Sequence, residues 1–215
     1  LRTPVTVLNL QTKILLSQFP EHEALHNLSK GLVRIQHLVT QLLALAKQDA
    51  ALSLIEPPAA FYLNDVVLNC VEQLMNLALQ KNIDLGFERN DEIAMQSFES
   101  TTHSIVFNLL DNAIKYTPHQ GIINISVYRD AENFAYIQIE DSGAGIDPAQ
   151  YHQVLQRFYR VHHHLEVGSG LGLSIVSRIA YWFGGTIKVD QSPHLGGARF
   201  IMSWPAKRHS KHMDK

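Results

Sequence analysis

An apolar heptad seam near the start of the chain restricts its fold more than any other feature. Seven residues recur at alternating spacings of 3 and 4: Leu25, Leu28, Leu32, Ile35, Val39, Leu42 and Ala46. The same rhythm runs upstream of Pro20, with one polar interruption, through Leu1, Val5, Leu8, Thr12, Leu15 and Phe19. Such a seam predicts long helices packed in a bundle or coiled coil. Because two antiparallel helices cannot bury a whole seam between themselves, we expect residues 1–50 to form a helical hairpin that dimerises into a four-helix bundle. A monomeric hairpin packed on the rest of the chain is the alternative.

Composition excludes several functional classes. The 215 residues are 46% hydrophobic and carry a net charge of -2, which gives no general attraction to nucleic acid. The apolar runs are far too short for a membrane span, and we expect no signal peptide. The single cysteine, Cys70, fits a reducing compartment. The first residue is Leu1 and not methionine, so we expect a fragment or processed piece of a longer protein.

The rest of the chain predicts an α+β domain. Residues 51–60 lose the heptad and contain Pro57-Pro58, which is typical of a linker. In residues 61–205 we expect several helices, the first of them capped by Asn64 or Asp65, and strands joined as hairpins. Hairpin strands beside helices favour a sandwich in which the helices cover one face of the sheet. The expected helices cover 65–80, 101–116 and 174–183, and the expected strands cover 83–88, 122–128, 135–140, 186–190 and 199–204. Residues 206–215 are a basic tail.

A polar stripe marks the helix expected over residues 101–116. Asn108, Asn112 and Lys115 stand at i, i+4 and i+7, so two amides and an ammonium share one face. Amide oxygens suit Mg²⁺, and a neighbouring lysine suits phosphate. The commoner interpretation of such a stripe is an ordinary solvated surface.

Two glycine-rich loops follow this helix. Asp141-Ser142-Gly143-Ala144-Gly145-Ile146 comes directly after an expected strand, and Asp141 can accept a hydrogen bond from an exocyclic amine. Gly168-Ser169-Gly170-Leu171-Gly172-Leu173 opens an expected helix, where exposed N–H groups can cradle phosphate. Neither loop has the sequence of a P-loop or of the dinucleotide fingerprint.

Taken in order, these motifs resemble the N, G1, F and G2 boxes of sensor histidine kinases, with Arg157-Phe158-Tyr159-Arg160 as the F box. Leu1-Arg2-Thr3-Pro4 is similar to the end of the His-Glu-Leu-Arg-Thr-Pro box of that family. The sequences from Gly168 to Val176 and at Ser203-Trp204-Pro205 resemble quorum-sensing-type receptor kinases. The resemblance covers nearly all of residues 1–205. It implies a dimerisation and phosphotransfer hairpin followed by a catalytic ATP-binding domain, forming the cytoplasmic portion of a bacterial inner-membrane receptor that meets the membrane only through an upstream region.

The resemblance also implies a role for each matching residue. Asn112 would ligate Mg²⁺, with Asn108 supporting the metal or the phosphates, and Lys115 would neutralise phosphate charge. Asp141 would accept from the adenine amino group, and Arg157 or Arg160 would reach phosphate or the partner helix. The remaining implied ATP-binding residues are Tyr116, Gly143, Gly145, Ile146, Phe158, Gly168, Gly170, Leu171 and Gly172. The implied partners are a second copy of the chain and a response regulator receiver domain.

Three features bear on how far the family pattern carries over to this chain. The phosphoacceptor histidine and its neighbouring glutamate would immediately precede Leu1, and the chain does not contain them. Thr3 matches a position that the family uses to orient water for dephosphorylation of the response regulator. This role of Thr3 would be impaired without the neighbouring glutamate. Ala198 stands where the family often has threonine.

Two other functions remain open. One is an ATP hydrolase of the same nucleotide fold, although such enzymes carry a water-activating glutamate where this chain has the non-basic Asn108. The other is a degenerate, non-catalytic module that dimerises and binds a regulator.

Overall fold

The structure is a computed structural model that describes residues 8, 11–12, 14–16, 19, 22–29, 31–32, 58–156, 159, 161 and 172–205. The chain divides into two compact units, with the main boundary between Ile55 and Glu56. Each unit is described by itself below.

The described residues of the first unit are mostly helical, at positions 8, 11–12, 14–16, 23–29 and 31–32. Thr12 Oγ1 donates to the Leu8 carbonyl oxygen at 2.8 Å. Four seam residues expose about half of their surface in the single chain, namely Leu8, Leu15, Phe19 and Leu28. These four residues present an apolar surface to solvent, as expected of helices that lack a partner, whereas Thr12 and Leu32 of the same seam are buried.

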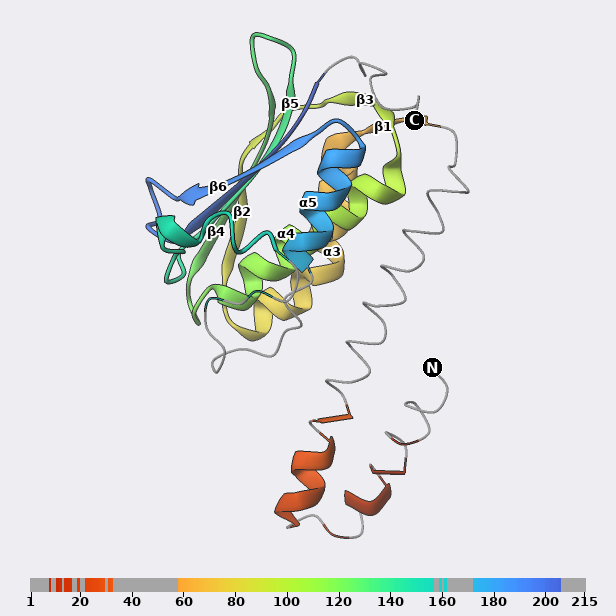
Figure 1. Ribbon diagram of the computed structural model, residues 1–215, viewed down its shortest axis with the longest axis vertical. Coiled ribbons are helices and arrows are strands. Elements are labelled where there is room, and N and C mark those ends of the chain that lie inside the picture. The colour runs from red at the N-terminus through yellow and green to blue at the C-terminus, as the bar shows by residue number, and fades with distance from the viewer. Residues whose placement is uncertain are drawn as a thin grey trace. The chain divides into compact units, whose positions relative to one another are not determined.

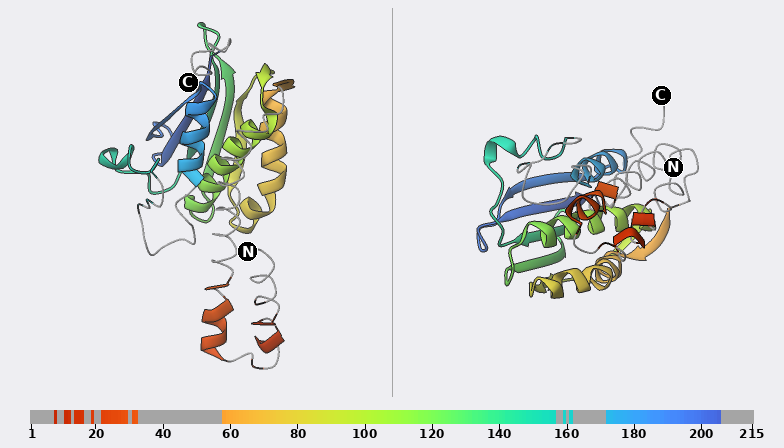
Figure 2. Two further views of the ribbon diagram at one scale, coloured as in Figure 1. Left: turned by 45° about the vertical axis from the view of Figure 1, so that its right-hand side comes forward. Right: turned by 90° about the horizontal axis from the view of Figure 1, so that it is seen from below.

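The second unit contains a five-stranded sheet with three helices on one face (Figures 1 and 2). The sheet has the order β2-β4-β5-β7-β6; β2 runs parallel to β4, and the other pairs are antiparallel. A separate two-stranded sheet pairs β1 with β3. In chain order the elements are β1 (Ala59–Tyr62), α3 (Leu63–Gln80), β2 (Asp84–Asn90), β3 (Ala94–Ser97), α4 (Glu99–Tyr116), β4 (Ile122–Arg129), β5 (Ala135–Asp141), the 3₁₀ helix η1 (Pro148–Gln150), α5 (Gly172–Trp182), β6 (Thr186–Gln191) and β7 (Ala198–Trp204). The predicted α+β sandwich with helices on one sheet face is confirmed.

The core lies between the helices and the sheet. Apolar residues alternate along the central strands, so that one side chain in two points at the helices. On β4 and β5 these residues are Ile123, Ile125, Val127, Ile137 and Ile139, none of which has measurable exposure. The apolar stripe of α4 covers them with Ile105, Leu109, Leu110, Ala113 and Ile114. This packing leaves the polar stripe of α4 on the side away from the core.

One local prediction was wrong, and one small sheet was missed. Neither Asn64 nor Asp65 caps α3, because the helix begins at Leu63 and has no side-chain cap. The Asn64 side-chain oxygen instead accepts from the Ile93 amide at 3.4 Å. The small β1–β3 sheet was not predicted, and β1 begins at Ala59, inside the segment that we predict as a linker.

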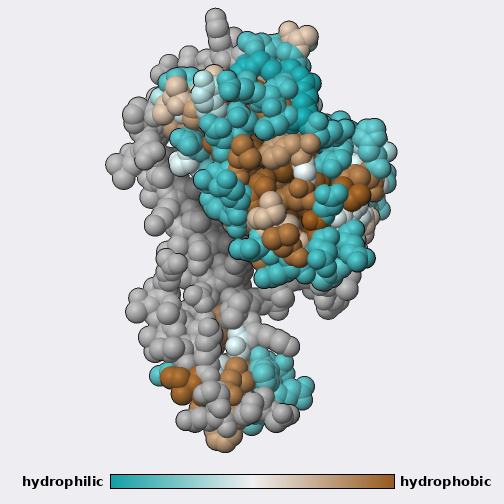
Figure 3. Space-filling model, turned by 180° about the vertical axis from the view of Figure 1, so that it is seen from behind, coloured by the Kyte–Doolittle hydropathy of each residue, from teal (hydrophilic) through white to brown (hydrophobic). Residues whose placement is uncertain are grey.

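The surface of the second unit is mixed. Seen from the side opposite to Figure 1, hydrophobic side chains gather within a hydrophilic surround (Figure 3). The large hydrophobic residues that α3 exposes are Leu68, Leu77 and Leu79. Within the described residues, no helix combines the length and the apolar character that a bilayer span requires.

Candidate functional site

The last residue of β5, Asp141, is the most constrained carboxylate of the candidate site. Its side chain is buried, and Oδ1 accepts from the backbone amides of Gly143 at 2.8 Å and Ala198 at 3.1 Å. Burial raises the pKa of Asp141, and these two amide donors oppose that rise. Among the described residues, none donates a hydrogen bond to Oδ2. Asp141 is therefore a fixed acceptor whose second oxygen is available to a ligand.

Glycines allow three segments to approach this carboxylate. A Cβ atom on Gly143 would lie 2.6 Å from the Tyr116 carbonyl oxygen, so the loop after β5 packs against the end of α4. Gly145 has a positive φ of 71°, and its Cβ position is 3.4 Å from the Gly196 carbonyl oxygen. A Cβ on Gly197 would overlap both the backbone and the side chain of Asp141. Only glycine fits at Gly143 and Gly197 without displacing backbone atoms.

The asparagine stripe of α4 meets the first residue of α5. Asn108 Nδ2 donates to the Ser104 carbonyl oxygen at 2.7 Å, which fixes the amide and turns Oδ1 toward α5. A Cβ on Gly172 would lie 3.1 Å from Asn108 Oδ1 and 3.5 Å from Asn112 Nδ2. The N–H groups at the start of an α-helix attract anions, and amide oxygens suit Mg²⁺. The donor set therefore fits a metal ion together with a phosphate.

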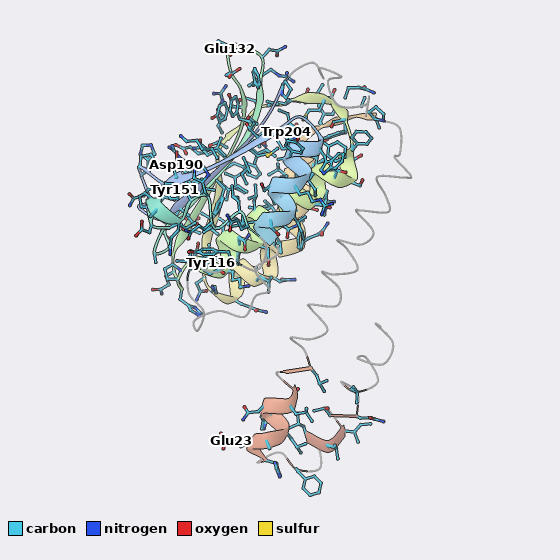
Figure 4. All side chains as sticks on the ribbon, viewed as in Figure 1. Glu23, Tyr116, Glu132, Tyr151, Asp190 and Trp204 are labelled. Carbon is cyan, nitrogen blue, oxygen red and sulfur yellow. The ribbon has the colours of Figure 1, made fainter. Side chains whose placement is uncertain are left out.

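The end of α4 carries a cation and an aromatic ring. Lys115 Nζ lies 5.8 Å from the centre of the Tyr116 ring. Tyr116 is 42% exposed and lies at the same end of the unit as the start of α5, whereas Trp204 lies at the opposite end (Figure 4). One end of the unit thus combines an acceptor carboxylate, two amides, an ammonium and a helix N-terminus.

An ion cluster occupies the other face of the sheet, beside Asp141. Arg199 Nε and Nη2 donate to Asp190 at 2.6 and 2.9 Å, and Arg199 Nη1 lies 3.6 Å from Glu140 Oε1. Glu140 is only 1% exposed, and neither of its carboxylate oxygens has a hydrogen-bond partner within the described parts of the chain. Burial raises the pKa of Glu140, which Arg199 partly offsets, and the hydrogen bonds from Arg199 lower the pKa of Asp190.

Eight of the residues predicted for the site lie on α4, at the end of β5, in the loop that follows β5, or at the start of α5. They are Asn108, Asn112, Lys115, Tyr116, Asp141, Gly143, Gly145 and Gly172. Ile146 follows them in the same loop and is half-buried. The other predicted residues lie outside the described residues: Thr3, Arg157, Phe158, Arg160, Gly168, Gly170 and Leu171.

Sequence reasoning missed two contacts to Asp141. Gly197 packs directly against it, and the Ala198 backbone amide supports its Oδ1. Ala198 was considered only for its missing hydroxyl group. The signal that could have revealed both residues is the glycine pair Gly196-Gly197 directly before β7, the strand that pairs with β5.

Comparison with known proteins places these features in a family. The family described as "Histidine kinase-, DNA gyrase B-, and HSP90-like ATPase" matches residues 99–208. The sensor protein QseC of Escherichia coli (strain K12) is 33% identical over 209 residues, which cover 95% of this chain and 45% of that protein. The chain therefore spans about half the length of the curated relatives it matches.

Two solved structures agree with this result. The cytoplasmic segment of the histidine kinase QseC has 26% sequence identity and a TM-score of 0.56, covering 81% of this chain and 94% of that one. A mycobacterial sensor histidine kinase, MprB, has 27% identity and a TM-score of 0.61, covering 70% of this chain and 98% of that one. The resemblance to sensor histidine kinases is confirmed, and the chain belongs to the family of histidine kinase-, DNA gyrase B- and HSP90-like ATPases.

Proposed function

We propose that the chain is the kinase core of a sensor histidine kinase. It binds Mg-ATP and transfers the γ-phosphoryl group to a histidine that would stand on the dimerisation hairpin directly ahead of Leu1, from which a response regulator aspartate receives it. The observation that carries the proposal is the convergence of the Asp141 carboxylate, the Asn108 and Asn112 amides and the start of α5 at one end of one unit.

Adenine recognition is assigned to Asp141. Backbone amides occupy Oδ1, so Oδ2 accepts the hydrogen bond from the adenine amino group. The glycines at 143 and 197 let the base approach the backbone closely. Guanine carries an oxygen where adenine carries its amino group, and that oxygen would face the carboxylate and be repelled. The site therefore selects ATP over GTP.

Phosphate binding is assigned to the other side of the site. The N–H groups at the start of α5 and the Lys115 ammonium attract the triphosphate, and the Asn112 side-chain oxygen ligates Mg²⁺, with Asn108 in support. The metal ion supplies charge neutralisation on the phosphate oxygens. The protein contributes position and hydrogen-bond donors, which is what phosphoryl transfer mainly requires.

In the proposed transfer, an imidazole nitrogen of the acceptor histidine attacks the γ-phosphorus. A nitrogen–phosphorus bond forms, the bond from the γ-phosphorus to the bridging oxygen breaks, and ADP leaves with that electron pair, while the other ring nitrogen releases its proton to solvent. No water needs to be activated. Asn108 agrees with this chemistry, because an amide has no basicity with which to take a proton from water. The exposed seam residues of the first unit support the second copy of the chain as a partner.

Calorimetric titration with Mg-ATP tests the nucleotide site. We expect a dissociation constant in the micromolar to millimolar range, and roughly a tenfold to hundredfold increase in Asp141→Asn, because a hydrogen bond to a charged group is lost. Asp91→Asn is the matched control, since Asp91 is a half-exposed partner of Arg89 outside the site. Equal affinity for GTP, or no loss in Asp141→Asn, would contradict the assignment.

Phosphoryl transfer is tested by placing a His-Glu pair directly ahead of Leu1. Incubation with ATP should then give a phosphate that is labile in acid and stable in base, as expected of a nitrogen–phosphorus bond. The same extension with Gln-Glu is the control and should take up no phosphate. Steady release of inorganic phosphate without a labelled histidine would favour the hydrolase instead.

A further inference from the structure

Lys81, in the turn after α3, binds the end of α4 with its whole ammonium group. Lys81 Nζ donates to the carbonyl oxygens of Ile114 at 3.0 Å, Lys115 at 2.7 Å and Thr117 at 3.1 Å. An ammonium has three N–H donors, so all of them are used. These acceptors are 33 to 36 residues further along the chain, and the contact is therefore tertiary.

This contact completes the C-terminus of α4. The last carbonyl groups of a helix have no partner within it and carry a partial negative charge. The Ala113 carbonyl accepts from the Thr117 amide at 2.9 Å and from Thr117 Oγ1 at 2.7 Å, and the Tyr116 carbonyl packs against Gly143. The two carbonyls that lie between these in sequence, those of Ile114 and Lys115, accept from Lys81. It therefore both neutralises and fixes the turn that carries Lys115 and Tyr116.

The backbone around Lys81 holds the segment that follows α4. The Gln120 amide donates to the Lys81 carbonyl at 2.9 Å, and the Asp84 amide donates to the Gly121 carbonyl at 2.9 Å. On the other side, Ser142 Oγ accepts from the Ile122 amide at 2.8 Å. The segment from 117 to 122 is thus clamped between the Lys81 turn and the loop that begins at Asp141.

We propose that Lys81 is a positioning residue of the nucleotide site. Its ammonium holds the last turn of α4, so that Lys115 faces the phosphates and Tyr116 stays against the Asp141 loop. Lys81 acts through these residues and does not touch ATP. The inference rests on the proposed function, because the ligand that it positions is the Mg-ATP assigned above.

The test compares Lys81→Met, Lys81→Arg and the control Lys188→Met in the full chain. Lys188 is also an ion-paired lysine of this unit, bonded to Asp190 at 2.9 Å on β6, away from the site. We expect Lys81→Met to raise the calorimetric dissociation constant of Mg-ATP about tenfold, close to the effect of one charge-assisted hydrogen bond. Lys81→Arg, which keeps the charge and several donors, should stay within about threefold, and Lys188→Met should match the wild type.

Calorimetry separates positioning from folding. A lysine that served only stability would leave the dissociation constant unchanged as long as nearly all of the Lys81→Met protein is folded, because the apparent affinity falls only in proportion to the folded fraction. Urea unfolding of the nucleotide-free variant measures that fraction. Hydrogen exchange without nucleotide gives a second readout. In Lys81→Met, the amides of Lys115, Tyr116 and Thr117 should gain more in exchange rate than those of β5, since only the last helical turn loses its support.

Three outcomes overturn the inference. The first is an unchanged dissociation constant in Lys81→Met while the wild type binds Mg-ATP, which leaves the proposed function standing. The second is an equal rise in exchange at α4 and β5. The third is a wild type that binds no Mg-ATP, which removes the proposed function as well. If Lys81→Met does not fold, Lys81→Gln replaces it. The glutamine amide donates only two hydrogen bonds, so we expect a rise in the dissociation constant of Mg-ATP that is smaller than the rise expected for Lys81→Met.

Discussion

Arg199→Met is expected to leave a buried carboxylate without its counter-ion. Glu140 is 1% exposed on β5, with Arg199 Nη1 3.6 Å from its Oε1. Methionine keeps much of the apolar stem and removes the charge. The carboxylate must then either remain ionised without a partner or take up a proton.

Protonation sets the upper limit of the cost. Taking a glutamate from an ordinary pKa of about 4.3 to the neutral form at pH 7 requires about 4 kcal/mol, at about 1.4 kcal/mol per pH unit. At pH 5.5 the same step requires roughly 2 kcal/mol. Because burial raises the folded-state pKa of Glu140 above its unfolded value, the ionised form opposes folding. The penalty in Arg199→Met should therefore shrink as the pH falls toward the unfolded pKa.

Urea unfolding at pH 7 and pH 5.5 measures this penalty. In Arg199→Met the free energy of unfolding should fall by about 3 to 4 kcal/mol at pH 7, and by clearly less at pH 5.5. In the Glu140→Gln background, the pH-dependent part of the Arg199→Met effect should disappear, leaving the loss of the Asp190 pair. An Arg199→Met penalty that is equal at both pH values and in both backgrounds would refute the reasoning.

Three further predictions concern other parts of the chain. Gly197→Ala should weaken Mg-ATP binding by more than about tenfold, because the new Cβ overlaps Asp141; Gly86→Ala, with open space at its Cβ, is the calorimetric control. Leu28→Glu should weaken dimerisation by at least about a hundredfold in sedimentation velocity, since each copy loses an apolar seam contact; an unchanged dimer would argue for the monomeric hairpin. Cys70 should react with a thiol reagent only at the rate of unfolding, because its burial raises the pKa to about 12; fast reaction of the native chain would disagree.

The sequence predicted those elements whose periodicity reflects burial. β4, β5 and β7 were found within one residue of their bounds, because their alternating apolar side chains face a helical layer. β1 and β3 were missed because each has only four residues and their pairing joins segments far apart in the chain. The start of α3 was misplaced, because the Asn64 side chain bonds to the distant Ile93 amide rather than to its own helix.

The candidate site could be proposed from the sequence where it consists of motifs, but not where a side chain would act through tertiary contacts. Asn108, Asn112 and Asp141 carry recognisable chemistry at recognisable spacings. Lys81 does not, since a lysine in a turn between a helix and a strand has an ordinary pattern. Its acceptors are backbone carbonyls, which every residue provides, so only the folded chain reveals the contact.

The bond from the Ala198 amide to Asp141 Oδ1 joins residues that are 57 positions apart. During synthesis on a ribosome, the Asp141 loop emerges long before the strand that completes it. Until β7 arrives, β5 has an unpaired edge next to a carboxylate that has only one of its two backbone donors. With Asp141 in its proposed role, we expect a nascent or truncated chain that stops before Ala198 not to hold nucleotide tightly, so that ATP would stabilise this unit only after its C-terminal hairpin has docked.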